Sequence, residues 1–378
     1  MNMFRNRADN SALGRWFWTV DRWTVLAIGT LICFGYVMML AASPAVAERI
    51  GQSRDIFILK QIVFLAAAGG VTLAVSMLDL RGVRRLALIG CAIALLLTMV
   101  TMVIGSEIKG ARRWISLPGM SLQPSEFLKP CFAVTAAWLI SEQRRQPGFP
   151  GWIIAGFLFL LIGALLKMQP DIGMLGVIVL VFFVQVFVAG INLFIVGGLA
   201  GLGLGVAASA YFLFHHVRER VDRFLAPAGN DHYQVLRAKQ AFGSGGLTGR
   251  GPGEGRVKDM LPDAHADFIF AVTGEEFGFI VCAVIVGLFA FVVLRGLLRL
   301  MKEQDMFVIL AAAGLVAGFG FQAFINMGST MALIPTKGMT LPFISYGGSS
   351  ALAVALGMGM LLALTRRRHG MGPDGGNS

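Results

Sequence analysis

Residues 261–294 read LPDAHADFIFAVTGEEFGFIVCAVIVGLFAFVVL. A polar turn that ends in Asp267 leads directly into an apolar run long enough to cross a bilayer as a helix. Glu275 and Glu276 follow two turns further along that run. Ionisable side chains are costly near hydrocarbon and are usually retained for a function. This stretch therefore predicts a membrane helix with a charged site at its start.

Composition extends this prediction to the whole chain. Of its 378 residues, 56% are hydrophobic and only 14% are charged, whereas soluble domains carry about a quarter charged residues. The values predict an all-α polytopic membrane protein, because apolar runs of about 20 residues form helices rather than barrel strands. The net charge of +11 does not indicate nucleic-acid binding, because the basic residues lie in short loops, where they set topology.

About ten apolar runs have the length of a transmembrane helix. They lie near residues 20–42, 57–78, 83–104, 125–141, 152–168, 171–190, 191–214, 268–294, 305–328 and 345–365. The arginine-rich loops then share one side, which the positive-inside rule makes cytoplasmic. The expected organisation is a cytoplasmic segment (1–19), a transmembrane domain (20–366) and a disordered cytoplasmic tail (367–378).

A large periplasmic loop, about residues 215–267, is expected between helices 7 and 8. Residues 217–224 read as a short amphipathic helix, and Asp231 could cap a second helix that ends near Gly243. The glycine-rich stretch 243–255 then predicts a flexible hinge.

Cysteine and histidine spacing gives no sign of a metal site or a disulfide. All four cysteines lie in apolar spans, where we expect them to pack against neighbouring helices. They are Cys33, Cys91, Cys131 and Cys282.

The loop at 105–124 contradicts the charge pattern of the other outer loops. It carries Lys109, Arg112 and Arg113 on the predicted outer side, so we expect it to bind an anion. Trp114 follows the arginines, as part of that site or as an interfacial anchor.

A helix-start signal ends this loop. In Gln123-Pro124-Ser125-Glu126, proline and serine favour a helix start and place the glutamate in its first turn. Lys129 follows one turn later. Glu126 is either a functional acid or one that only complements the helix dipole.

Asp267 also has two readings. It could take part in chemistry or only cap the helix that follows. Glu275 and Glu276 are expected to bond neighbouring helices within the bundle. His265 lies near enough to modulate Asp267, although a lone loop histidine is usually solvated.

Residues 335–350 form the third polar stretch, before the last span. Two prolines and three glycines predict an irregular backbone, which is tolerated at membrane depth only when buried in protein or lining a cavity. Lys337 is a candidate phosphate contact, or a lysine that extends to lipid headgroups. The small residues 347–351 predict a close helix contact.

These stretches together resemble the SEDS family (shape, elongation, division and sporulation), the membrane glycosyltransferases that polymerise peptidoglycan. The resemblance covers residues 20 to 366, and the runs 322–326 and 335–343 are similar to its division members. The most specific pieces are Gly110–Trp114, Gln123–Glu126, Gln169–Gly173, Asp267–Gly278 and Pro335–Ser350. Ala266 and Met174 depart from the family, each standing where threonine is usual.

The resemblance implies a ten-span fold and the substrate lipid II, a disaccharide-pentapeptide on undecaprenyl pyrophosphate. The essential aspartate of the family corresponds to Asp267, its arginine-tryptophan motif to Arg113 and Trp114, and the acid of its Gln-Pro-Ser-Glu motif to Glu126. The expected substrate-binding residues are Arg112, Arg113, Trp114, Gln123, Glu126, Lys129 and Lys337. The implied partner is a class B penicillin-binding protein, a transpeptidase, with other division proteins at the septum of the bacterial inner membrane.

The expected reaction is a single displacement with inversion, because only one acid is well placed as a base and no second nucleophile is evident. Asp267 would take the proton of the acceptor sugar hydroxyl, while cations stabilise the pyrophosphate. No cofactor is expected; a divalent metal could assist the pyrophosphate, but the sequence shows no dedicated site. A transporter that flips lipid II and a non-catalytic division scaffold remain alternatives.

Overall fold

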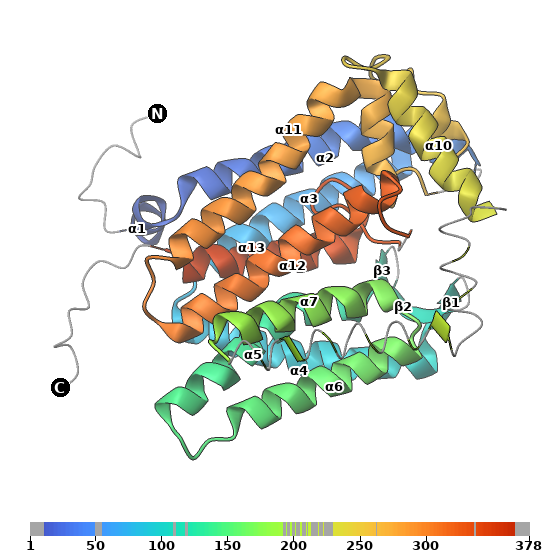
Figure 1. Ribbon diagram of the computed structural model, residues 1–378. Coiled ribbons are helices and arrows are strands. Elements are labelled where there is room, and N and C mark those ends of the chain that lie inside the picture. The colour runs from blue at the N-terminus through green and yellow to red at the C-terminus, as the bar shows by residue number, and fades with distance from the viewer. Residues whose placement is uncertain are drawn as a thin grey trace.

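The computed structural model describes residues 11–49, 55–108, 111–117, 120–191, 230–261, 263–335 and 338–366, and scattered positions between 194 and 222. Within these residues the chain is an all-α polytopic membrane protein with three short strands added at one end (Figure 1). Six described helices are long and apolar enough to span a membrane, and two shorter apolar helices lie beside them. The predicted fold class is confirmed.

The helices of the bundle correspond to the predicted apolar runs. They are α2 (Arg22–Arg49), α3 (Asp55–Ser76), α4 (Leu80–Ile104), α5 (Pro124–Arg145), α6 (Gly151–Met168), α7 (Ile172–Val188), α11 (Ile269–Leu300), α12 (Met306–Thr330) and α13 (Gly348–Leu364). Shorter helices are α1 (Ala12–Thr19), α10 (Asn230–Gly245) and the 3-10 turn η1 (Val257–Asp259). The predicted seventh span (191–214) lies largely outside the described residues, as does the amphipathic helix at 217–224.

Arginines join the helix ends at one end of the bundle, which we call the terminal end. Arg295, near the end of α11, binds both carboxylate oxygens of Asp21, at 2.6 and 2.7 Å. Arg299 reaches the same carboxylate at 3.0 Å and donates to Thr365 O at 2.7 Å. The start of α2 and the ends of α11 and α13 therefore meet here, so α2 and α11 run in opposite directions.

The opposite end, the loop end, carries α10 and the three strands (Figure 1). The strands are β1 (Ser106–Ile108), β2 (Ala111–Leu117) and β3 (Met120–Leu122), paired antiparallel in the order β1-β2-β3. The sequence analysis treated this stretch as a plain loop. Ser349, at the start of α13, donates to Ser121 O at 3.0 Å and accepts from Gln123 N at 3.0 Å. The strands are therefore attached to the starts of α5 and α13.

Helix α11 is broken at Gly278, where φ is 78° and ψ is −177°. The backbone of residues 246–251 lies against the break and supplies two N–H donors and two carbonyl acceptors to it. A Cβ at Gly278 would lie 2.4 Å from Gly249 N, so only glycine fits this approach. The stretch predicted to be a flexible hinge is therefore hydrogen-bonded to α11 through residues 246–251.

Several local expectations can be compared with the structure. The predicted second loop helix is present as α10, but it begins at Asn230, so Asp231 lies inside the helix and the prediction that it caps the helix was wrong. The small residues near Gly348 do make a close contact, since a Cβ there would lie 2.6 Å from the Phe64 ring. The packing role expected of all four cysteines was wrong for Cys33, which lies exposed on α2, whereas the other three are buried.

Candidate functional site

Asp267 ends a turn that precedes α11 and is half-buried at the loop end. The residue that caps α11 is Phe268, and no side chain makes the capping hydrogen bond. The reading of Asp267 as a helix cap is therefore wrong. The backbone N–H of Asp267 instead donates to Asp263 O at 3.1 Å, which closes the turn.

The segment 338–347, which connects α12 to α13, lies against this turn. Ser345 Oγ donates to Ala266 O at 2.6 Å, and Tyr346 N donates to His265 O at 2.9 Å. The rings of His265 and Tyr346 are also in contact, with centroids 5.1 Å apart. His265 is buried, so the expectation that it is solvated was wrong. The 338–347 segment is therefore hydrogen-bonded to two consecutive residues of the turn.

Gly338 sets how closely this segment approaches the carboxylate. A Cβ built on Gly338 would lie 3.5 Å from Asp267 Oδ2, and its φ is +56°. Glycine takes this left-handed conformation at little cost, and its lack of a Cβ lets the backbone of the segment approach the carboxylate closely. Lys337, the predicted phosphate contact next to Gly338, lies outside the described residues.

The start of α5 supplies a buried ion pair. Pro124 begins the helix and Glu126 lies in its first turn, as predicted. Lys129 Nζ lies 2.8 Å from Glu126 Oε2, with the two side chains 6% and 11% exposed. Because burial excludes water, such a pair is much less screened than one at the surface. Glu126 therefore does more than complement the dipole of α5.

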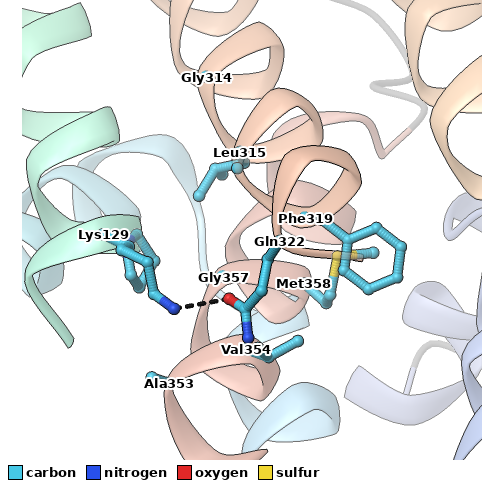
Figure 2. Close-up of a pocket in the computed structure, with 11 residues that line it drawn as sticks. Lys129, Gly314, Leu315, Phe319, Gln322, Ala353, Val354, Gly357 and Met358 are labelled. Atoms are coloured by element: carbon cyan, nitrogen blue, oxygen red, sulfur yellow. Dashed lines mark hydrogen bonds between the residues drawn. The ribbon is translucent and has the colours of Figure 1, made fainter. Parts of the chain in front are cut away.

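Lys129 also binds α12. Its ammonium donates to Gln322 Oε1 at 2.6 Å, in a hollow between α5, α12 and α13 (Figure 2). The Gln322 amide nitrogen donates in turn to Thr340 O at 3.1 Å and lies 3.3 Å from Ser350 Oγ. The ion pair of α5 is thereby connected to the segment that lies against Asp267.

Arg112 and Arg113 are adjacent in β2 and so point to opposite faces, as successive strand residues do. Arg113 turns toward the corner between α6 and α7, where it donates to Gln169 O at 2.7 Å and to Pro170 O. Its guanidinium also lies 3.6 Å from Asp171 Oδ2. Arg113 therefore holds this corner, and only part of its charge faces outward.

Asp171 caps α7 by accepting from Met174 N at 3.2 Å. The Gln123 side chain donates to the same carboxylate at 3.3 Å. Gln123 and Arg113 thus contact the same acid, Asp171. Asp171 belongs to a motif of the family resemblance, but it was not among the expected site residues. The signal was the Gln-Pro-Asp-Ile-Gly run, read only as a motif.

Arg112 faces the surface, where its guanidinium lies 3.6 Å from Glu107 Oε2 and both side chains are more than half exposed. It lines a separate hollow with Gln169 and Pro170, at the loop ends of α4 and α6. Trp114 is half-buried, and its carbonyl accepts from Ser106 Oγ at 3.3 Å. The predicted anion cluster therefore divides between two faces of one strand.

Glu275 and Glu276 are completely buried in α11. Both were expected to bond neighbouring helices, but they bind the glycine-rich loop instead. Glu275 accepts from the backbone N–H of residues 256 and 257, at 3.0 Å each. Glu276 accepts from Gly253 N at 2.9 Å and forms an ion pair with Lys258 at 2.6 Å. The carboxylate oxygens of both glutamates are therefore occupied by groups of the loop that precedes the Asp267 turn.

These contacts define a membrane helix bundle with a polar site at its loop end. The sequence profile of the family described as "Cell cycle protein" (FtsW, RodA, SpoVE) matches residues 22–370. The chain belongs to this family.

Relatives and solved structures are similar over nearly the whole chain. A Caulobacter vibrioides protein named "Probable peptidoglycan glycosyltransferase FtsW" is 46% identical over 365 residues, 96% of this chain and 94% of the relative. A Trichlorobacter lovleyi protein of the same name is 36% identical, over 90% and 92%. A chain of a peptidoglycan synthase complex matches with TM-score 0.77 and 27% identity, over 92% and 97%. Thermus thermophilus RodA matches with TM-score 0.66 and 26% identity, over 92% and 96%.

Proposed function

We propose that this chain is a peptidoglycan glycosyltransferase that polymerises lipid II into glycan strands during septal wall synthesis. The observation that carries the proposal is the placement of Asp267: it is half-buried, does not cap α11, and lies at the loop end against Gly338. The names of the relatives support a peptidoglycan glycosyltransferase activity. In this proposal the loop end faces the periplasm, where the substrate sugars reach it, and both termini are cytoplasmic.

Asp267 acts as the general base in the proposed step. Its carboxylate takes the proton of the acceptor sugar hydroxyl as that oxygen bonds to the anomeric carbon of the donor. The bond from the anomeric carbon to the pyrophosphate oxygen breaks on the opposite side, and undecaprenyl pyrophosphate leaves with the electron pair. The configuration at the anomeric carbon is therefore inverted.

Cations of the chain stabilise the negative charge on the leaving pyrophosphate. Lys129 is buried and is connected to the 338–347 segment through Gln322, and Arg112 is exposed at the loop end. Arg113 positions the α6–α7 corner as well as contributing charge. We assign Lys337 to the same group by its place beside Gly338. Within the described residues no group of three His, Cys, Asp or Glu side chains could hold a metal ion.

The proposed partner is a class B penicillin-binding protein at the septum of the inner membrane, together with other division proteins. This extends to the present chain what the matched structure of a peptidoglycan synthase complex coordinates, namely polymerization and crosslinking. A transpeptidase beside the site would receive each glycan strand as it forms.

Asp267→Asn tests the function. The variant keeps the size and hydrogen-bonding outline of the side chain but cannot take a proton, so polymerisation of labelled lipid II should fall about 100-fold or more. The assay uses purified full-length protein with its transpeptidase partner in detergent, read as glycan chain length. Asp259→Asn, at an exposed acid of the same end, is the matched control and should polymerise normally.

The same assay separates the alternatives. Detergent removes the two sides of the membrane, so a flippase or a scaffold forms no glycan there, while a polymerase does. Near-normal chains from Asp267→Asn would remove the base from the mechanism. If the native protein with its partner formed no glycan chains, the proposed glycosyltransferase function would be refuted.

A further inference from the structure

Asn326 lies on α12, one turn beyond Gln322, and is completely buried. Its amide nitrogen donates to two backbone carbonyls from different segments, Asp267 O at 3.0 Å and Met339 O at 2.6 Å. Only the nitrogen of an amide can donate, so two carbonyl acceptors fix the orientation of this side chain. Asn326 therefore ties α12 to the Asp267 turn and to the 338–347 segment at one point.

This contact completes the attachment of the turn. The carbonyls of His265 and Ala266 are bound by Tyr346 and Ser345, so the Asn326 bond engages the third consecutive carbonyl. The first two bonds come from a connecting segment, whereas Asn326 lies on the last turns of α12 and is buried within the bundle. The Asn326 bond therefore connects the turn directly to a helix of the bundle.

Burial alone does not account for an asparagine at this position. Its side-chain oxygen, Asn326 Oδ1, is buried and accepts no hydrogen bond within the described residues. A buried acceptor without a donor lowers stability. The amide is therefore explained by what its nitrogen binds rather than by a gain to the helix.

We propose that Asn326 is a positioning residue that holds the Asp267 carboxylate in its reactive orientation through the backbone. The proposal rests on the proposed role of Asp267 as the base. The carbonyl group that Asn326 binds and the side chain that ends in the carboxylate share one Cα, so movement of one reorients the other. A misplacement of about 1 Å can lower a rate about 100-fold.

Asn326→Ala and Asn326→Ser form a matched pair for the test. Their side chains are nearly equal in volume, but the serine hydroxyl can still donate to one carbonyl. We expect Asn326→Ala to lower kcat at least about 10-fold with the KM for lipid II changed less than about 2-fold. Asn326→Ser should recover a measurable part of kcat. Both are assayed as full-length protein with the transpeptidase partner, after size-exclusion and thermal-unfolding checks.

Thr330→Val is the control for losing a buried polar group on α12. Its hydroxyl donates to two backbone carbonyls of its own helix, Met327 O at 2.8 Å and Asn326 O at 3.3 Å, and not to the Asp267 turn. It should leave kcat unchanged. Where Asn326→Ala does not fold, Asn326→Ser against Thr330→Val carries the comparison.

Two results would overturn the positioning role while Asp267→Asn remains inactive. One is an Asn326→Ala enzyme with native kcat. The other is an equal loss of kcat in the alanine, serine and Thr330→Val enzymes in proportion to lost thermal stability. Native polymerisation by Asp267→Asn would instead overturn the proposed function, so the two failures are distinguishable.

Discussion

Replacing Lys129 by methionine asks whether the buried ion pair of α5 serves the fold or the chemistry. The ammonium lies 2.8 Å from Glu126 Oε2, and neither side chain is more than 11% exposed. Removing one member of a buried pair costs about 3–5 kcal/mol, because the other charge is left uncompensated. The change also removes the bond to Gln322. We therefore expect Lys129→Met to lower the free energy of unfolding by about that amount.

The double variant Glu126→Leu/Lys129→Met replaces both charged side chains by apolar ones of similar size. Replacing a buried ion pair by well-packed hydrophobic residues of similar volume is often neutral or stabilising. The double variant should therefore regain most of the stability that Lys129→Met loses. Polymerisation should not return, because losing a group that stabilises developing charge costs roughly 100-fold or more.

Thermal unfolding in detergent and the lipid II assay are run on the same preparations. Leu128→Met, at the buried neighbour of Lys129, is the control for packing changes in α5. A stable double variant that polymerises at the native rate would show that the pair is structural only. A double variant as unstable as Lys129→Met would refute the electrostatic reasoning.

Two further predictions concern the loop end. Gly278→Ala should lower the melting temperature, because φ is 78° and a Cβ would lie 2.4 Å from Gly249 N; Gly287→Ala, with nothing within 4 Å, should not. Arg112→Gln should change the free energy of unfolding by less than about 1 kcal/mol, because its pair with Glu107 is exposed. The same variant should raise the KM for lipid II if the outer cation contacts the pyrophosphate, and an unchanged KM would exclude that contact.

The membrane helices were predictable because length and hydropathy decide them almost without tertiary context. Helix α5 is the instructive case, since Glu126 and Lys129 make it too polar for a simple hydropathy criterion, yet Pro124 marked its start. The strands β1–β3 were not predicted. Their pairing depends on register between short segments, which the composition of the loop does not reveal.

The sequence singled out the residues of the candidate site but revealed few of their contacts. Asp267 and Glu126 stand out because a charge near hydrocarbon needs a reason. Their partners lie far away in sequence: Asn326 binds the Asp267 backbone across 59 residues and Gln322 binds Lys129 across 193. Both were visible only as part of a division-type run. Adjacent arginines were read as one cluster, whereas strand alternation separates Arg112 from Arg113.

The three acids of residues 267–276 show how the fold selects one of them. Glu275 and Glu276 are completely buried, and their oxygens are occupied by backbone N–H groups and by Lys258. Neither can approach a sugar hydroxyl without releasing the loop at residues 253–258. Asp267 is half-buried at the loop end, and Gly338 lies next to its carboxylate. Among these three acids Asp267 alone is partly exposed, and Asn326 binds its backbone, so it is the acid that we propose as the general base.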